Sequence, residues 1–175
     1  LVDFGKQDLE IMAVAFDANL RRNDGGIFAN PIFVDVIAFE HNLFEIANLV
    51  GREQQRALAL IQAIHAGADE ALMLDPRGFV ASCNSTNFFI ARGGELWTST
   101  GAYSFKGITQ RNVIAAWRGA GGTALECDFT LSQVYAADEA FVTGTLAGVT
   151  PVVAVDGRVI GSGRPGEQTR RAADL

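Results

Sequence analysis

The sequence predicts an α+β fold in which antiparallel strands are interspersed with helices. From residue 70 onward, short apolar runs are joined by turns that contain glycine or proline, a pattern typical of antiparallel strand pairs. Segments with apolar residues at helical spacing, bounded by capping or stop residues, lie among these runs. Together the two patterns indicate a sheet accompanied by helices within one fold.

The composition indicates one folded domain and excludes several classes of partner. Hydrophobic residues make up 49% of the 175 residues and charged residues 19%, as in ordinary globular proteins. The net charge is -6 without a basic stripe, so we expect no nucleic acid partner. No apolar stretch is long enough to span a membrane, so we expect no membrane partner. The two cysteines lack metal-ligand spacing, which predicts no metal site and a reducing, cytoplasmic setting.

Residues 1–51 do not resolve into elements, because apolar runs alternate with polar patches without a sustained period. The chain begins at Leu1, and its opening has no basic region followed by an apolar one. We therefore expect no signal peptide, and we expect that the start is cut off. The chain divides into an unparsed segment, 1–51, and one domain, 52–175.

The elements of the domain follow in order from residue 52. The first is a helix over 52–66, with a polar first turn and Gly67 as its stop. Thr109 and Thr130 are the expected side-chain caps of two later helices. The later elements are strands at 70–75, 79–83, 87–92 and 95–99, a helix from 109 to a stop at 119, a strand at 125–129, a helix at 131–137, a strand at 139–145, a hairpin at 152–160 and a helical tail at 166–171.

Two segments have the composition of an anion-binding site. GITQRNVI, 107–114, combines a glycine, a threonine and the free N–H groups of a first helical turn, although any capped helix gives the same pattern. TGTLAG, 143–148, follows an apolar strand with small residues that bring backbone N–H groups close to a ligand, although a simple loop looks similar. Together the two segments indicate an anion-binding site more strongly than either does alone, because a dianion is best held by two converging sets of donors.

Other motifs favour structural interpretations. The GxGxxG match at 161–166 has no following strand and no acidic residue about 20 positions later, so we reject a dinucleotide site. Cys83 is a candidate nucleophile only if a histidine approaches it, and a structural role is favoured. The carboxylates expected at turns or on the surface are Asp69, Glu70, Asp75 and Glu139. Trp97 and Trp117 are expected in the core.

Three segments in order, GADEALMLDPRGFVASCNSTNFFIARGGELWTS, FKGITQRNVI and ADEAFVTGTLAGVTPVVAVDGRVIGSGRPGEQTRR, resemble class IV aminotransferases of the branched-chain or D-amino-acid type. The resemblance covers about 110 residues, from Gly67 to Ala173. It implies the C-terminal, cofactor-binding domain of the fold-type IV enzymes, with pyridoxal 5'-phosphate as the cofactor. It also implies a homodimer.

The resemblance assigns roles to individual residues. Ser82 falls where the family has a glutamate that pairs with the protonated ring nitrogen, and a hydroxyl supports the electron sink far less unless a neighbour such as Asn84 helps. Gly144 and Leu146, with the turn between them, are implied near the substrate carboxylate. The implied cofactor-binding residues are Ser82, Phe105 in place of a leucine under the ring, Gly107, Ile108, Thr109 and Thr145.

The family's imine-forming lysine has no counterpart at the expected position. Counting back from Gly67 by the family spacing leads to Asn48 or Leu49, and neither forms an imine. The lysines of the chain are Lys6 and Lys106, and Lys106 is a weak candidate that stands beside the phosphate site. We hypothesise that the chain is a truncated or frame-shifted family member. The hypothesis fails if no other reading frame of the DNA encodes a lysine-bearing family segment.

The implied function is pyridoxal-phosphate-dependent transamination between an aliphatic or branched-chain amino acid and a 2-oxo acid. Two alternatives stay open. One is a non-catalytic pseudoenzyme or phosphate-ligand-binding subunit, which the missing lysine favours. The other is an aminodeoxychorismate lyase, which needs the same lysine.

Overall fold

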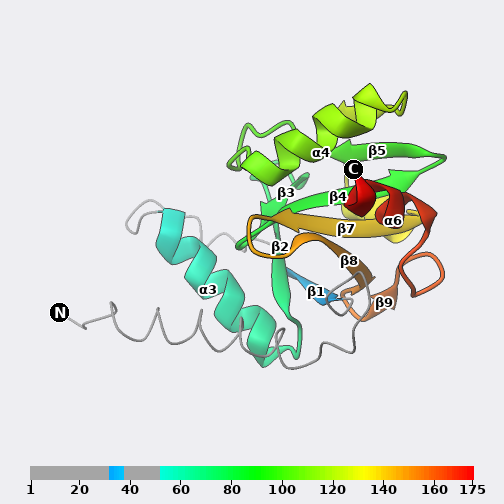
Figure 1. The fold of residues 1–175 in the computed structure, drawn as a ribbon. Coiled ribbons are helices and arrows are strands. Elements are labelled where there is room, and N and C mark those ends of the chain that lie inside the picture. Colours follow the sequence, from blue (N-terminus) through cyan, green and yellow to red (C-terminus); the bar gives the residue numbers. More distant parts are fainter. Residues whose placement is uncertain (1–31, 38–51) are drawn as a thin grey trace.

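One mixed sheet forms the centre of the computed structural model, which describes residues 32–37 and 52–175 (Figure 1). Its strands follow the order β3-β2-β1-β8-β7-β4-β5-β6, and β9 pairs with β8. The strands are β1 (Ile32–Ile37), β2 (Glu70–Leu74), β3 (Val80–Cys83), β4 (Asn87–Arg92), β5 (Glu95–Thr98), β6 (Ala124–Glu126), β7 (Glu139–Gly144), β8 (Gly148–Val155) and β9 (Arg158–Val159). The helices are α3 (Arg52–His65), α4 (Ile108–Gly119), α5 (Leu131–Tyr135) and α6 (Glu167–Asp174).

The predicted α+β class and the antiparallel pairs are confirmed, and three parallel pairs are added. β2–β3, β4–β5, β4–β7, β7–β8 and β8–β9 run antiparallel. β1 is parallel to both β2 and β8, and β5 is parallel to β6. Parallel neighbours need a crossover, which α4 supplies between β5 and β6. The strand β1 lies in the segment that the sequence left unparsed.

The hairpin turns form where their residue types predicted them. Asp156 and Gly157 join β8 to β9 with φ angles of 54° and 67°. A two-residue turn with positive φ at both central positions matches the twist of its strands, and Asp-Gly is a favoured pair for it. The first predicted helix is also confirmed, because α3 ends just before Gly67, which has a φ of 80°.

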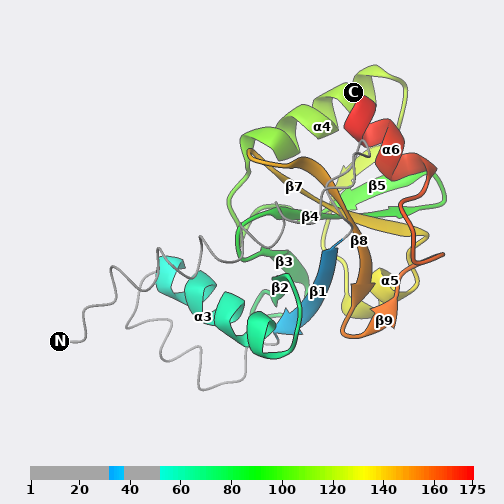
Figure 2. The same ribbon diagram turned by 60° about the horizontal axis from the view of Figure 1, so that its bottom comes forward.

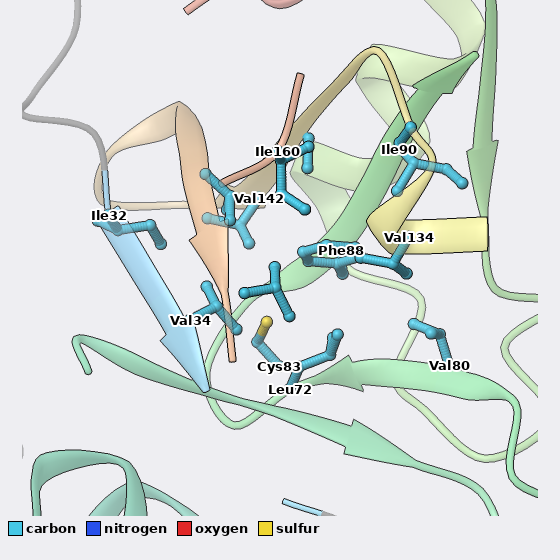
Figure 3. Packing of buried hydrophobic residues seen from close by; sticks show 14 of the residues in the cluster. Ile32, Val34, Leu72, Val80, Cys83, Phe88, Ile90, Val134, Val142 and Ile160 are labelled. Atoms are coloured by element: carbon cyan, nitrogen blue, oxygen red, sulfur yellow. The ribbon is translucent and has the colours of Figure 1, made fainter. Parts of the chain in front are cut away.

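The strand β4 is buried on both of its faces. Phe88 and Ile90 belong to a core cluster that also contains side chains of β1, β2, β3 and β8 (Figure 3). Phe89 lies on the opposite face and stacks on Phe141 of β7, with ring centroids 4.9 Å apart. This second cluster is covered by α4, whose Trp117 is fully buried as predicted. Figure 2 shows α4 and α6 on that side of the sheet, far from α3.

Two carboxylates that were expected at turns or on the surface accept hydrogen bonds from backbone N–H groups. Glu139 accepts the N–H groups of Gln168 and Thr169 at 3.0 and 2.9 Å and so caps the first turn of α6. Asp75 is 7% exposed and accepts the N–H groups of Arg77 and Phe79 at 2.8 and 3.1 Å. Asp75 lies at a turn, as expected, but is buried there by these local contacts. The surface assignment of Glu139 was wrong because the N–H groups that it binds lie 29 and 30 positions later in the sequence.

Glu70, also expected on the surface, is buried at the start of β2. It is 9% exposed, and its two carboxylate oxygens accept the hydroxyls of Ser85 and Thr86, each at 2.5 Å. Burial raises the pKa of the Glu70 carboxyl from its ordinary value of 4.5, although the two hydroxyls act in the opposite direction. Glu70, at the start of β2, therefore holds the connection between β3 and β4 through these two hydroxyls.

No helix in the described ranges, 32–37 and 52–175, is both long enough and apolar enough to cross a membrane.

The raised pKa predicts a pH dependence of stability. Between pH 4.5 and the raised pKa, the folded state binds more protons at Glu70 than the unfolded state does. The contribution of Glu70 to the free energy of unfolding is therefore fully present below pH 4.5 and is lost as the pH rises through the raised pKa. In urea denaturation at several pH values, we expect Glu70→Gln to gain stability relative to the unsubstituted chain as the pH rises.

The exposed Glu167 on α6 provides the control. We expect the difference between Glu167→Gln and the unsubstituted chain to lack this trend. A difference for Glu70→Gln that stays constant from acidic to neutral pH would contradict the buried, proton-binding carboxyl.

Candidate functional site

Three segments from distant parts of the chain meet where β4 begins. They are the β3–β4 connection at 84–86, the loop into α4 at 99–107 and the β7–β8 turn at 145–147. Asn87, the first residue of β4, pairs with Thr143 of β7, next to the closing pair Gly144 and Gly148. Both ribbon views show the start of α4 beside the β7–β8 turn (Figures 1 and 2). The two segments that the sequence suggested for one anion therefore lie at the same end of the sheet.

The first turn of α4 has no side-chain cap. Gly107 is the N-cap residue, so the prediction that Thr109 caps the helix was wrong; Thr109 is the second helical residue. The first N–H bonded into the helix is that of Arg111, which donates to the Gly107 carbonyl at 3.1 Å. The N–H groups of Ile108, Thr109 and Gln110 precede it and have no partner in the helix ladder. These donors and the positive end of the helix dipole favour an anion.

The β7–β8 turn presents exposed residues beside this helix start. Thr145 is exposed, and Leu146 is 80% exposed. A Cβ at Gly144 would lie 3.2 Å from Cγ2 of Thr86, so this turn packs against the β3–β4 connection. The hydroxyl of Thr143 is buried and has no hydrogen-bond partner among the described residues.

Asn87 connects the sheet to the loop before α4. Its Nδ2 donates to the Phe105 carbonyl at 2.7 Å, and its Oδ1 accepts the Gly107 N–H at 3.2 Å. The side chain is 7% exposed. Asn87 was not among the predicted site residues. The available signal was its position, because asparagine is depleted in strands and here opens one.

Ser82 is buried on β3, and its hydroxyl proton takes part in a hydrogen bond within the protein. Its hydroxyl donates to the Thr86 carbonyl at 2.7 Å, and Asn87 Nδ2 lies 3.4 Å from its Oγ. Asn84, the suggested helper, is engaged elsewhere, because its Oδ1 accepts the Ala71 N–H at 2.8 Å. The neighbour that faces Ser82 is therefore Asn87.

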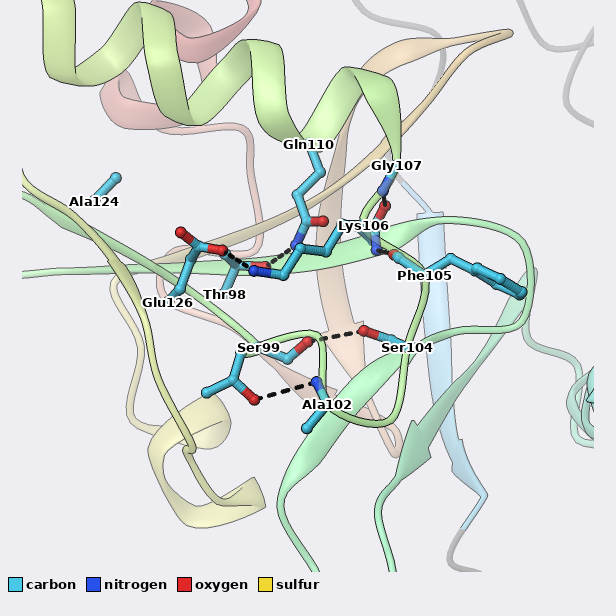
Figure 4. Close-up of polar contacts among 12 residues, drawn as sticks. Thr98, Ser99, Ala102, Ser104, Phe105, Lys106, Gly107, Gln110, Ala124 and Glu126 are labelled. Atoms are coloured by element: carbon cyan, nitrogen blue, oxygen red, sulfur yellow. Dashed lines mark hydrogen bonds and ion pairs between the residues drawn. The ribbon is translucent and has the colours of Figure 1, made fainter.

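Lys106 is held away from the centre of the site. Its Nζ forms an ion pair with Glu126 of β6 at 2.7 Å, as Figure 4 shows. Its alkyl chain lies on Gly101, where a Cβ would come within 2.5 Å of Lys106 Cε. The lysine thus anchors the loop before α4 to the edge of the sheet.

Phe105 lies on the surface, in the loop before α4. Its side chain is 52% exposed, and the guanidinium carbon of Arg56 lies 4.7 Å from the centroid of its ring. This cation–π contact joins α3 to the loop before α4. The positions expected for the imine lysine, Asn48 and Leu49, lie outside the described residues.

The remaining motifs have structural roles. Cys83 is 1% exposed, and burial, with the nearby Glu70 charge, raises the pKa of its thiol well above 9.0, so the thiol stays protonated at neutral pH. The 161–166 glycine segment precedes α6, whose first N–H groups are occupied by Glu139. The described residues contain no cluster of histidine, cysteine or carboxylate side chains able to hold a metal ion.

Comparison with known proteins gives consistent matches. The family model described as Amino-transferase class IV matches residues 50–155. The chain is 46% identical to a branched-chain-amino-acid aminotransferase of Pseudomonas aeruginosa over 114 residues, 65% of this chain and 37% of that protein. It is 44% identical to a putative branched-chain-amino-acid aminotransferase of Methanocaldococcus jannaschii over 115 residues, 65% of this chain and 40% of that protein.

A solved structure extends the similarity to the fold. An aminotransferase from Brucella abortus, bound to the cofactor PLP, superposes with a TM-score of 0.71 and 29% identity. The match covers 83% of this chain and 52% of that chain. The chain thus spans about two fifths of the curated relatives and about half of this solved chain. The family match over more than half of its length means that the chain belongs to the class IV aminotransferases, which use pyridoxal 5'-phosphate.

Proposed function

We propose that this chain binds pyridoxal 5'-phosphate through its phosphate group, as the cofactor-binding part of a protein that transfers an amino group. The observation that carries the proposal is that two segments able to offer backbone donors lie together at the start of β4. One is the uncapped first turn of α4, and the other is the β7–β8 turn. A phosphate dianion satisfies donors of this kind better than a neutral ligand does.

The residues at the site fit the phosphate. The N–H groups of Ile108 and Thr109 would donate to its oxygens, and Thr145 would add a contact from the opposite side. Gly107 would let the backbone approach, since it brings no side chain against Asn87. The unpaired hydroxyl of Thr143 leaves hydrogen-bonding capacity beside the same turn.

The ring of the cofactor would meet a less typical environment. Ser82 stands where the family has a glutamate, and its proton is donated to the Thr86 carbonyl. It can therefore accept a hydrogen bond from a protonated ring nitrogen, but it supplies no negative charge to keep that nitrogen protonated. Phe105 would lie against the ring.

The proposed reaction is transfer of an amino group between an aliphatic or branched-chain amino acid and a 2-oxo acid. When bound, the cofactor supplies an electron sink for the substrate α-carbon. Gly144 and Leu146, in the turn beside the phosphate, would bind the substrate carboxylate through backbone N–H groups. The proposal is supported by the names of the relatives, which are branched-chain aminotransferases.

A second candidate function is binding without catalysis, and one observation favours it. Lys106 is engaged by Glu126, and the family spacing places the imine lysine at Asn48 or Leu49, neither of which is a lysine. A chain that holds the phosphate without a free lysine would act as a non-catalytic subunit. No feature of the described residues favours an aminodeoxychorismate lyase over these two.

The contribution of the helix start can be tested by removing a single N–H group. Proline suits the first helical position, and Gly107, with φ -63° and ψ 154°, already has the conformation that precedes proline. Ile108→Pro therefore deletes one donor while keeping the helix. A hydrogen bond to a charged group contributes about 1.5–3 kcal/mol, so calorimetry should give a dissociation constant for pyridoxal 5'-phosphate about tenfold or more higher.

Ile108→Ala is the matched control, because it removes the same exposed side chain and keeps the N–H. We expect its affinity to stay near that of the unsubstituted chain and both variants to melt at similar temperatures. Equal affinity of Ile108→Pro and Ile108→Ala would contradict binding at this helix start.

Borohydride distinguishes catalysis from simple binding. Any imine between the cofactor and a lysine is fixed by reduction and adds the cofactor to the mass of the chain. Because Lys106 is ion-paired 2.7 Å from Glu126, we expect no adduct on Lys106 in peptide mass spectrometry. Glu126→Gln, which frees Lys106, is the comparison. An adduct on Lys106 of the unsubstituted chain would favour the catalytic function.

We also propose that two copies of the chain pair. Support comes from the exposed apolar side chains of Phe105, Ile108 and Leu146 around the site, because such groups commonly mark an interface when they cluster. Sedimentation velocity should give the mass of two chains at micromolar concentration. A mass of one chain throughout the concentration range would refute the pairing.

A further inference from the structure

One buried amide ties together the two segments of the proposed anion site. Asn87 donates from Nδ2 to the Phe105 carbonyl and accepts the Gly107 N–H at Oδ1. Its amide therefore bridges the two residues on either side of Lys106. The two partners differ in kind, one an acceptor and one a donor. Only one orientation of the amide therefore satisfies both, and neither an aspartate nor an apolar residue of similar size reproduces it at neutral pH.

The fit between Asn87 and Gly107 is close. A Cβ at position 107 would lie 2.5 Å from Asn87 Oδ1. The φ and ψ of Gly107, -63° and 154°, are open to any residue, so glycine is required here by space and not by backbone conformation. The amide thus fixes the path of the chain immediately before the N–H groups of α4.

The backbone of Asn87 reaches the second segment. It pairs with Thr143 of β7, and the next residue, Gly144, ends β7 just before the β7–β8 turn. The side chain of Asn87 therefore holds one set of donors while its main chain holds the strand that carries the other. Asn87 is therefore connected to both segments, through its side chain to one and through its main chain to the other.

We propose that Asn87 is a positioning residue for the anion site, which sets the first turn of α4 at the distance from the β7–β8 turn that one phosphate requires. The inference rests on the proposed function. It differs from the assigned phosphate contacts because Asn87 acts through Phe105 and Gly107, the residues to which its side chain is hydrogen-bonded.

Asn87→Asp gives a test with a pH signature. At pH 8 the introduced carboxylate faces the Phe105 carbonyl without a proton to donate, and we expect a dissociation constant for pyridoxal 5'-phosphate about tenfold higher than that of the unsubstituted chain. As the pH falls, the protonated carboxyl can donate to Phe105 and still accept from Gly107. The affinity ratio between the two chains should return toward one near pH 5, because burial raises the pKa of the introduced carboxyl.

Two further variants separate positioning from general destabilisation. Asn84→Asp makes the same chemical change three residues away, where the side chain contacts β2 and not the loop before α4. We expect it to lower the melting temperature without a pH-dependent recovery of affinity. Gly107→Ala disturbs the same contact from the other side and should also weaken binding, with no recovery at low pH.

The outcomes distinguish the inference from the function on which it rests. Recovery of affinity by Asn87→Asp at low pH, measured by calorimetry relative to the unsubstituted chain, supports the positioning role. Unchanged affinity, or an equal loss at every pH in a variant that remains folded by circular dichroism, overturns it alone. Absence of binding to the unsubstituted chain overturns both. If Asn87→Asp does not fold, Asn87→Ser, which loses both hydrogen bonds to the loop before α4, decides: a loss of affinity larger than that of Asn84→Ser supports the positioning role, and an equal affinity of the two variants overturns it.

Discussion

The register between β4 and β7 is the constraint on which the rest of the structure depends. Because β4 is buried on both faces, Phe88 and Ile90 belong to one core cluster while Phe89 belongs to the other. A slip of one residue would exchange these faces and expose or overpack both clusters. It would also remove Asn87 from Phe105 and from Thr143. The packing of the core and the geometry of the site are therefore set by the same pairing.

Local chemistry explains which parts of the fold the sequence could predict. Turns such as Asp156-Gly157 depend on backbone preferences of neighbouring residues, so they were predicted at their observed positions. The parallel pairing of β1 and the burial of Glu70 depend on partners far along the chain. In the site, GITQ was apparent as a helix start, whereas Asn87 acquires its role from groups 18 and 20 positions later. The sequence showed an asparagine at the start of a strand, but it did not show which distant groups that asparagine would bind.

The site separates binding of the cofactor from reaction with it. The proposed phosphate donors are mostly backbone N–H groups, which depend on the path of the chain more than on side-chain identity. The reaction depends on individual side chains, and the resemblance places the family's glutamate at Ser82 and its lysine at position 48 or 49, where the sequence has neither residue type. Lys106 forms an ion pair with Glu126 and so supports the loop before α4. In the proposed function, phosphate binding therefore depends on the path of the chain, whereas the reaction depends on a few side chains.

In the proposed site, one phosphate is held by both segments at the start of β4. Assigned amide NMR spectra of the chain, titrated with pyridoxal 5'-phosphate, test it most directly. We predict that the amides of Ile108 and Thr109 on α4 shift together with those of Gly144 at the end of β7 and Thr145 in the β7–β8 turn, with one dissociation constant. Shifts confined to α4, or two sets of shifts with different constants, would contradict a single shared site.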